Sequence, residues 1–200
     1  MRFRFDSGVW GPWTARAVFE SALIVFSVLL ALTVDGCREE AQRRRQLAEA
    51  QASLLQELEF NRNLLREAYY LAYHLRLLKI YRDMDSSGRT EGRDELFKDG
   101  VHMALLRDAA WRSFVPSTIA AEMSFRSRAI LAGVYAEQDR LNNLHYLALG
   151  GIMAPNADRD RPSFVRDQIR VIYHYLDDVT AAERRLLAAY DEAIKQLQAN

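Results

Sequence analysis

The sequence predicts an all-α protein, in which an N-terminal transmembrane helix leads into a long stalk helix and an antiparallel helical bundle. Three observations predict this class. Half of the 200 residues are hydrophobic, whereas the chain has only 9 glycines and 4 prolines, a composition that suits long helices and few turns. One apolar run lies near the N-terminus, and later apolar residues recur at helical spacings. A chain of this length has room for one anchored domain with its own core.

The apolar run from Ala17 to Val34 reads AVFESALIVFSVLLALTV. At about 1.5 Å per residue, a helix over this run is about 27 Å long, close to the hydrocarbon thickness of a bilayer. We therefore expect a tail over residues 1–16 and a transmembrane helix over 17–35. The polar exceptions within the run are Glu20, Ser21, Ser27 and Thr33.

Three other interpretations of the run are less consistent with its flanks. A cleaved signal peptide would be followed by a small-x-small site, which is missing here. A lipoprotein signal is suggested by Gly36-Cys37, but the acidic Asp35 interrupts the small apolar stretch that such a signal has. A buried helix of a soluble protein would need apolar partners on every face, and the rest of the chain is amphipathic instead.

The residues around the start of the span suit a membrane interface. Trp10 and Trp13 precede the span, and such aromatic side chains favour the headgroup region. Glu20 lies one helical turn after Arg16, so the two can pair. A contact between Glu20 and a partner protein is the alternative, because a carboxylate within a membrane is costly unless it is satisfied.

The charges that flank the span give little orientation signal, because similar numbers of arginines lie on both sides. A short basic N-terminal tail usually stays in the cytoplasm while a long C-terminal part crosses. We therefore expect the bacterial inner membrane as the location, with the extrinsic domain on the extracytoplasmic side. The arginines concerned are Arg2, Arg4 and Arg16 before the span, and Arg38, Arg43, Arg44 and Arg45 after it.

Residues 36–85 predict one long amphipathic stalk helix. No Pro or Gly occurs between Cys37 and Asp85, and the first part of the segment mixes charges that can pair three or four residues apart. Toward its end the segment is apolar on several sides, which indicates that it enters a bundle. The residues that recur at helical spacing are Leu47, Ala50, Leu54, Leu58, Leu65, Ala68, Ala72 and Leu75.

Residues 86–200 predict the remaining helices of the bundle. After the turn cluster at 85–88, we expect a second helix over 94–112. A third helix begins at 116–118 and ends near 149, where Gly150-Gly151 supplies a stop. A fourth begins at Pro162, a residue that the first turn of a helix tolerates. Four amphipathic helices with short polar loops favour an antiparallel bundle.

Composition and motifs argue against several classes of function. The 27 basic and 27 acidic residues balance, without the basic face that a nucleic-acid-binding protein needs. The single cysteine, Cys37, makes no disulfide framework, and no phosphate-binding loop, nucleophile elbow or metal motif occurs. We therefore expect no enzymatic activity, no metal and no cofactor. The histidines, expected to be packing or surface residues, are His74, His102, His145 and His174.

An unusual concentration of aromatic residues lies in the middle of the chain. These side chains are expected to belong to the core, and a recognition surface is the alternative interpretation. The residues are Tyr69, Tyr70, Tyr73, Trp111 and Phe114.

The segment FESALIVFSVLLALTVDGCREEAQRRRQLAEAQASLLQELEFNRNLL resembles the opening of a widespread family of single-span bacterial membrane proteins of unknown function. The later VYAEQDRLNNL, from Val134 to Leu144, resembles the helical second half of the same proteins. The resemblance implies an anchor and a helical domain, and it brings no known chemistry. The matching positions of the opening are Glu20, Val34, Asp35, Glu39 and Asn61.

These observations favour a non-catalytic accessory subunit that docks on a larger bacterial membrane complex, such as a respiratory or photosynthetic assembly. Its partners would be integral membrane proteins and the bilayer, without nucleic acid. Ser27 and Ala31 lie four residues apart on one helix face, where small side chains allow close helix contact. The alternative is a single-span sensor or regulator that acts through helix contacts, with a homodimer as its simplest form.

Overall fold

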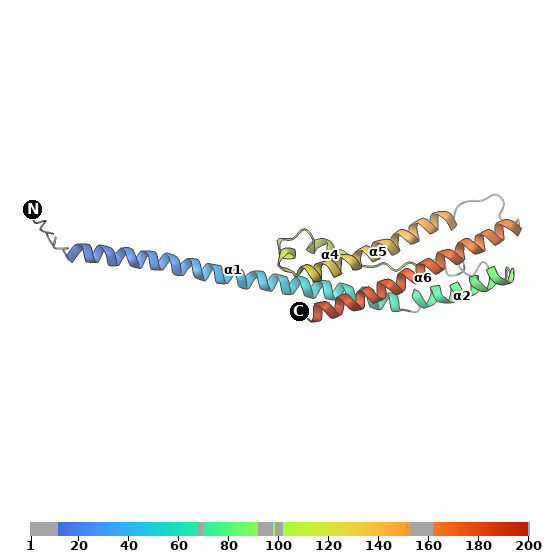
Figure 1. Ribbon diagram of the computed structural model, residues 1–200, viewed down its shortest axis with the longest axis horizontal. Helices are drawn as coiled ribbons and strands as arrows, with labels where there is room; N and C mark the ends of the chain where they lie inside the picture. The colour runs from blue at the N-terminus through green and yellow to red at the C-terminus, as the bar shows by residue number, and fades with distance from the viewer. Residues whose placement is uncertain (1–11, 68–69, 92–97, 99–101, 153–161, 200) are drawn as a thin grey trace, which may run out of the picture. The chain divides into compact units, whose positions relative to one another are not determined.

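The computed structural model describes residues 12–67, 70–91, 98, 102–152 and 162–199 (Figure 1). The described residues form helices and no strand, which confirms the all-α class. The chain divides into two compact units, Met1–Gln46 and Leu47–Asn200. The elements are α1 (Pro12–Arg66), α2 (Leu71–Ser87), α4 (Ala109–Phe114), the 3-10 helix η1 (Thr118–Glu122), α5 (Phe125–Ile152) and α6 (Pro162–Gln198).

The first unit contains the beginning of α1. The helix begins at Pro12, whose missing N–H costs nothing in a first turn. It continues through Asp35 and Gly36 without interruption, so the expected span over 17–35 is helical and has no break at its end. Gly36 lies within the helix, and a Cβ atom added at this residue would have no other part of the chain within 4 Å.

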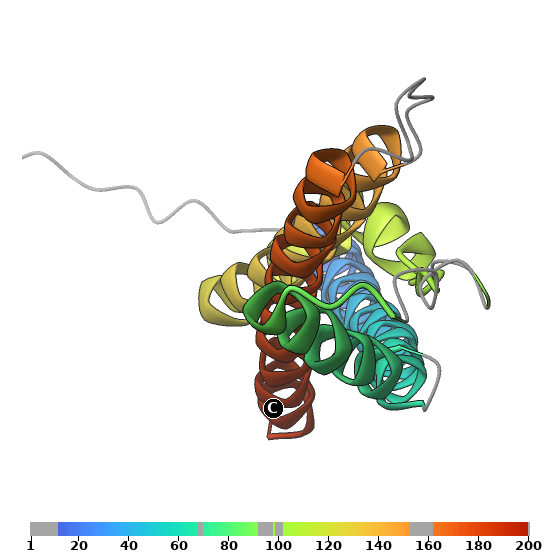
Figure 2. The ribbon, with the colours of Figure 1, turned by 90° about the vertical axis from the view of Figure 1, so that its right-hand side faces the viewer.

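In the second unit α6 packs against both α2 and α5 (Figure 2). Figure 1 shows that α5 and α6 run in opposite directions, and that α2 also runs opposite to α6. The predicted fourth helix is confirmed over Pro162–Gln198. Its buried face follows helical spacing and forms the centre of the core, through Val165, Ile169, Ile172, Leu176, Val179, Ala182, Leu186, Tyr190, Ala193 and Leu197.

The prediction of a single helix over 36–85 is wrong, because the helix is interrupted between α1 and α2. Tyr70, just before α2, has φ −113° and ψ −105°, outside the helical region. This interruption shifts the buried face by one residue. A continuous helix with Leu58 and Leu65 on its buried face would also bury Ala72, seven residues further on. Instead, Ala72 is exposed and its neighbour Tyr73 is buried. No Gly or Pro marks this position, so packing and not a local breaker ends α1.

The expected second helix over 94–112 is also not formed as predicted. Residues 92–97 and 99–101 lie outside the described residues, and residues 102–108 have no regular secondary structure. Helix α4 spans only Ala109–Phe114. The bundle of this unit is therefore built from the end of α1, α2, α5 and α6, together with a non-helical segment that runs back along them (Figure 1).

The third helix begins later and ends later than expected. Residues 118–122 form η1, and Met123 leaves the helical region with ψ 142°. Helix α5 then begins at Phe125, where the Ser124 hydroxyl accepts a hydrogen bond from the backbone N–H of Ser127 at 3.1 Å. Gly150 and Gly151 do not stop the helix, which ends at Ile152. Residues 153–161, between α5 and α6, lie outside the described residues.

Candidate functional site

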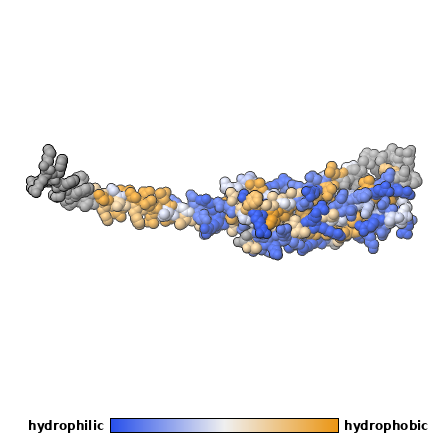
Figure 3. Space-filling view, in the orientation of Figure 1, coloured by the Kyte–Doolittle hydropathy of each residue, from blue (hydrophilic) through white to orange (hydrophobic). Residues whose placement is uncertain are grey.

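The apolar surface of the first unit is the most unusual feature of the described residues. Near the N-terminus of α1, an 18-residue window has a mean hydropathy of 2.3, and none of it is buried. Figure 3 shows this apolar surface between the grey N-terminal residues and the charged part of α1. One helix is therefore long and apolar enough to cross a membrane. Its exposed residues include Val18, Phe19, Leu23, Ile24, Val25, Phe26, Val28, Leu29, Leu30, Leu32 and Val34.

Three polar side chains in this surface, Glu20, Ser27 and Thr33, have hydrogen-bond partners within α1. The Arg16 guanidinium donates to the Glu20 carboxylate at 2.9 Å, which is the pairing expected from their spacing. The Ser27 hydroxyl donates to the carbonyl of Leu23 at 2.8 Å. These bonds reduce the cost of placing polar groups beside lipid. Ser27 and Ala31 are both exposed.

The interface tryptophans fall outside what can be described. Trp10 precedes the described residues, and only the backbone of Trp13 is described, at the start of α1.

The Arg16 and Glu20 side chains are 81% and 59% exposed, so their ion pair does not exclude contact with headgroups or with another protein.

The central aromatic residues do not form one outward surface. Tyr73 and Phe114 are buried in the core, and their side chains face other residues of the second unit. Tyr70 is partly buried against the same core, whereas Tyr69 lies outside the described residues. Trp111 is partly buried and stacks on Tyr135, with ring centroids 4.9 Å apart and planes 5° apart. The described members of this concentration therefore pack into the core.

Glu57, a buried carboxylate of α1, holds the beginning of α4. It accepts hydrogen bonds from the backbone N–H groups of Ala110 at 2.8 Å and Trp111 at 3.3 Å. The Tyr135 hydroxyl of α5 donates to the same carboxylate at 2.6 Å. The first N–H groups of a helix lack partners within it, so Glu57 supplies the acceptor that α4 needs. Burial, reinforced by Glu57, raises the pKa of Tyr135 and keeps this donor protonated.

Asn61, one turn after Glu57, holds the non-helical segment. Its side-chain amide accepts from the Arg107 N–H at 2.8 Å and donates to the Arg107 carbonyl at 2.7 Å. Gln138 of α5 also donates to that carbonyl, at 3.1 Å, and accepts from the Tyr190 hydroxyl at 2.7 Å. Backbone polar groups that are buried without partners are costly, so these amides let a segment without helical bonds pack against the bundle.

A second buried polar cluster connects α2, α5 and α6. His74 Nδ1 lies 2.9 Å from Glu183 Oε1, and His145 Nδ1 lies 2.9 Å from the Tyr175 hydroxyl. The His74 and His145 rings are 6.1 Å apart. Burial, with a smaller contribution from His74, lowers the pKa of His145 to about 4.

The described residues of the His74 and His145 cluster do not form a metal site. Among the described residues, no three His, Cys, Asp or Glu side chains are placed to hold a metal ion. His74 Nε2, His145 Nε2 and Glu183 Oε2 are buried and have no hydrogen-bond partner in the described part of the chain. The arrangement can hold three helices together, and it can respond to protonation.

The sequence interpretation missed both polar clusters, although a signal for one of them was present. Glu57 and Asn61 interrupt the apolar stripe of Leu54, Leu58 and Leu65, on positions that face the core. Polar residues at core positions indicate buried hydrogen bonds. His74 and Glu183 are 109 residues apart in the chain, and nothing in their local sequence relates them.

Comparisons of the chain with family models, with curated proteins and with solved structures found no match. The functional interpretation therefore depends on the geometry and on the sequence.

Proposed function

We propose that this protein is a non-catalytic, membrane-anchored accessory subunit of a larger membrane protein complex. The observation that carries the proposal is the unburied 18-residue apolar window of α1, with its mean hydropathy of 2.3. Such a surface is unfavourable in water and matches the thickness of a bilayer. The resemblance to single-span bacterial proteins favours the bacterial inner membrane, and the basic N-terminal tail favours an extracytoplasmic second unit.

The span offers a surface for contact with another membrane helix. Ser27 and Ala31 are exposed and lie four residues apart in α1, so they share a face. Small side chains allow two helix backbones to approach closely in lipid, where packing and not water exclusion drives association. We propose that this face contacts an integral membrane partner, while Glu20 is satisfied by Arg16 within its own helix.

The second unit offers apolar side chains for an extrinsic contact. Val115 is 52% exposed at the end of α4, and Phe125 is 79% exposed at the start of α5. Exposed apolar side chains such as these can contribute to an interaction surface. In contrast, the polar residues Glu57 and Asn61 hold the fold together, which favours a role in contact over a role in catalysis.

The proposal is tested by purifying the full chain from native membranes in a mild non-ionic detergent. We expect an integral membrane partner to co-purify at a fixed ratio, measured by mass spectrometry. The variant Val115→Asp/Phe125→Asp should lose this partner at least partly, because two charges oppose burial of the surface. The control Val171→Asp changes an exposed residue on α6 and should retain the partner.

One observation favours the second candidate, a single-span sensor or regulator. Helix α1 is continuous over 55 residues, from Pro12 to Arg66, so the segment in the membrane and the segment in the bundle belong to one helix. In that case the purified chain would be a monodisperse homodimer without another protein. This result would contradict the accessory-subunit proposal.

A further inference from the structure

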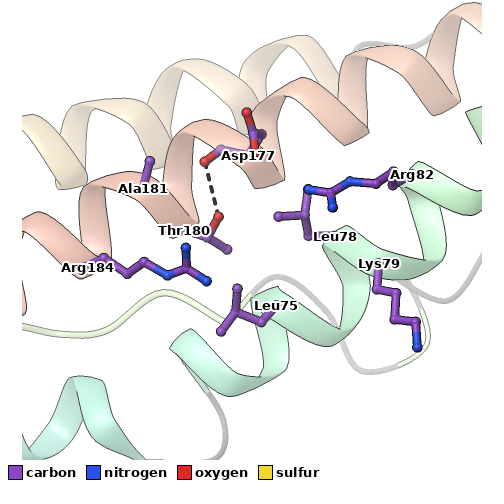
Figure 4. Close-up of a pocket in the computed structure, with 8 residues that line it drawn as sticks. All are labelled: Leu75, Leu78, Lys79, Arg82, Asp177, Thr180, Ala181 and Arg184. Carbon is purple, nitrogen blue, oxygen red and sulfur yellow. Dashed lines mark hydrogen bonds between the residues drawn. The ribbon is translucent and has the colours of Figure 1, made fainter.

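A groove of about 380 Å³ lies between α2 and α6, on the surface of the second unit (Figure 4). Its two walls are matched helical stripes: residues 75, 78, 79 and 82 of α2 face residues 177, 180, 181 and 184 of α6. In each stripe the spacing is three, four and seven, so the four residues share one helix face. The volume falls within the range of small-molecule sites.

The charged lining of the groove is mostly positive. Arg82 and Lys79 come from α2, Arg184 comes from α6, and Asp177 is the one acidic lining residue. Figure 4 shows the Arg82 and Arg184 side chains extending toward each other from the two helices. The two guanidinium groups therefore approach the same space from opposite ends of the groove.

The four charged lining residues form no ion pair within the described part of the chain. The ion pair of Arg170 with Asp85, at 3.6 Å, joins the same two helices outside the groove. Other exposed arginines of the second unit do pair, as Arg66 does with Asp191 at 2.9 Å. Two facing guanidinium groups without a bound carboxylate provide a position for an anion.

The floor of the groove is apolar or already bonded. Leu78 is 6% exposed, and the Thr180 hydroxyl donates to the Asp177 carbonyl at 3.1 Å. Leu75, another lining residue, is partly buried. A ligand in the groove would thus meet leucine side chains as well as cationic ones.

We propose that this groove binds a phosphate group, held between the guanidinium groups of Arg82 and Arg184. Planar guanidinium groups match the geometry of phosphate oxygens and form two parallel hydrogen bonds to them, and Lys79 adds positive charge at the rim. The phosphate comes either from a soluble phosphate ester or from an anionic lipid headgroup, since both present the same oxygens. This site is independent of the proposed accessory function.

The test uses the full chain, purified in a non-ionic detergent and titrated by calorimetry at constant ionic strength. One arm uses inorganic phosphate, with sodium chloride as the comparison anion. The other arm uses dihexanoyl phosphatidylglycerol, with dihexanoyl phosphatidylcholine as the comparison lipid. Saturable binding of phosphate supports a soluble source, and tighter binding of the phosphatidylglycerol supports a lipid source.

The variant Arg82→Gln/Arg184→Gln should lower the affinity at least about tenfold, since it removes the charge-assisted bonds. The control Arg166→Gln/Arg126→Gln removes the same charge at two exposed arginines outside the groove and should change affinity less than about twofold. The variant Arg82→Lys/Arg184→Lys keeps the charge, loses the planar geometry and should show an intermediate loss. If the glutamine variant does not fold, the lysine variant provides the test of the site in its place.

Three results would overturn the proposal. The first is the absence of saturable binding in both arms. The second is an affinity of the Arg82 and Arg184 variants equal to that of the original chain. The third is an equal loss in the control variant, which would show attraction by net charge and no defined site.

Discussion

Glu183 Oε1 lies 2.9 Å from His74 Nδ1, and each side chain is 1% exposed. The pair joins α6 to α2, beside the buried apolar residues of the core. Such a buried pair adds little over an apolar pair, but removing one partner leaves the other without compensation. It therefore makes the packing of α2 on α6 sensitive to single substitutions.

Glu183→Ala is expected to lower the free energy of unfolding by about 1–3 kcal/mol, because His74 loses its buried hydrogen-bond partner. Glu192→Ala, at an exposed position of the same helix, should change it by less than about 0.5 kcal/mol. Urea denaturation of the full chain in non-ionic detergent, followed by far-UV circular dichroism, measures both. Equal stability of the Glu183→Ala variant and the original chain would contradict the importance of this pair.

The stability of the second unit should fall in acid because of His145. Burial lowers the pKa of this side chain from 6.5 to about 4, so the unfolded chain takes up a proton below pH 6.5 that the folded chain does not. The His145 contribution is fully present above pH 6.5 and is lost as the pH falls toward 4, by at most about 1.4 kcal/mol per pH unit.

The variant His145→Gln should flatten this part of the pH dependence, whereas His174→Gln, at an exposed position, should not. Urea denaturation between pH 4 and pH 8 provides the comparison. An unchanged slope in the His145→Gln variant would assign the pH dependence to other groups.

The carboxylate of Glu57 should be important for the attachment of α4. Glu57→Ala leaves the Ala110 and Trp111 N–H groups and the Tyr135 hydroxyl without their acceptor, at an expected cost of about 3 kcal/mol. Tyr135→Phe removes one of these bonds and should cost about 1 kcal/mol. Glu49→Ala, at an exposed position of α1, is the control. A Glu57→Ala variant as stable as this control would contradict the role of Glu57.

The parts of the fold that could be predicted are those set by local periodicity. Helix α6 has a regular apolar stripe and begins at a proline, so its course follows from the sequence alone. The apolar run of α1 is likewise a local property. These features require no knowledge of which segments meet.

The predictions that were wrong concern segments whose structure is decided by long-range contacts. The interruption of the helix at Tyr70 changes which residues of the following helix are buried. This change is needed only because α2 packs against α6. The segment at 102–108 is apolar enough for a helix, but Asn61 and Gln138 bond the backbone of Arg107 in an irregular form. Gly150 lies in a continuing helix because a glycine permits a helix end and does not require one. The buried clusters depend on the same contacts.

The orientation in the membrane can be read from Cys37, which is exposed just beyond the apolar run. We expect a membrane-impermeant maleimide to label Cys37 in intact spheroplasts, because the second unit is proposed to be extracytoplasmic. A chain with Cys37→Ser and Ser7→Cys carries its thiol before the span and should be labelled only after lysis. The reverse pattern would place the second unit in the cytoplasm.

The central claim is that the apolar part of α1 lies in a bilayer, and alkaline carbonate extraction of membranes tests it most directly. The full chain should remain in the membrane pellet and dissolve only in detergent. Ile24→Lys/Leu29→Lys should release the chain, because each lysine costs about 3 kcal/mol in the hydrocarbon. The control Val171→Lys/Leu105→Lys, at exposed positions of the second unit, should stay in the pellet. Release of the unmodified chain into the carbonate supernatant would contradict the claim.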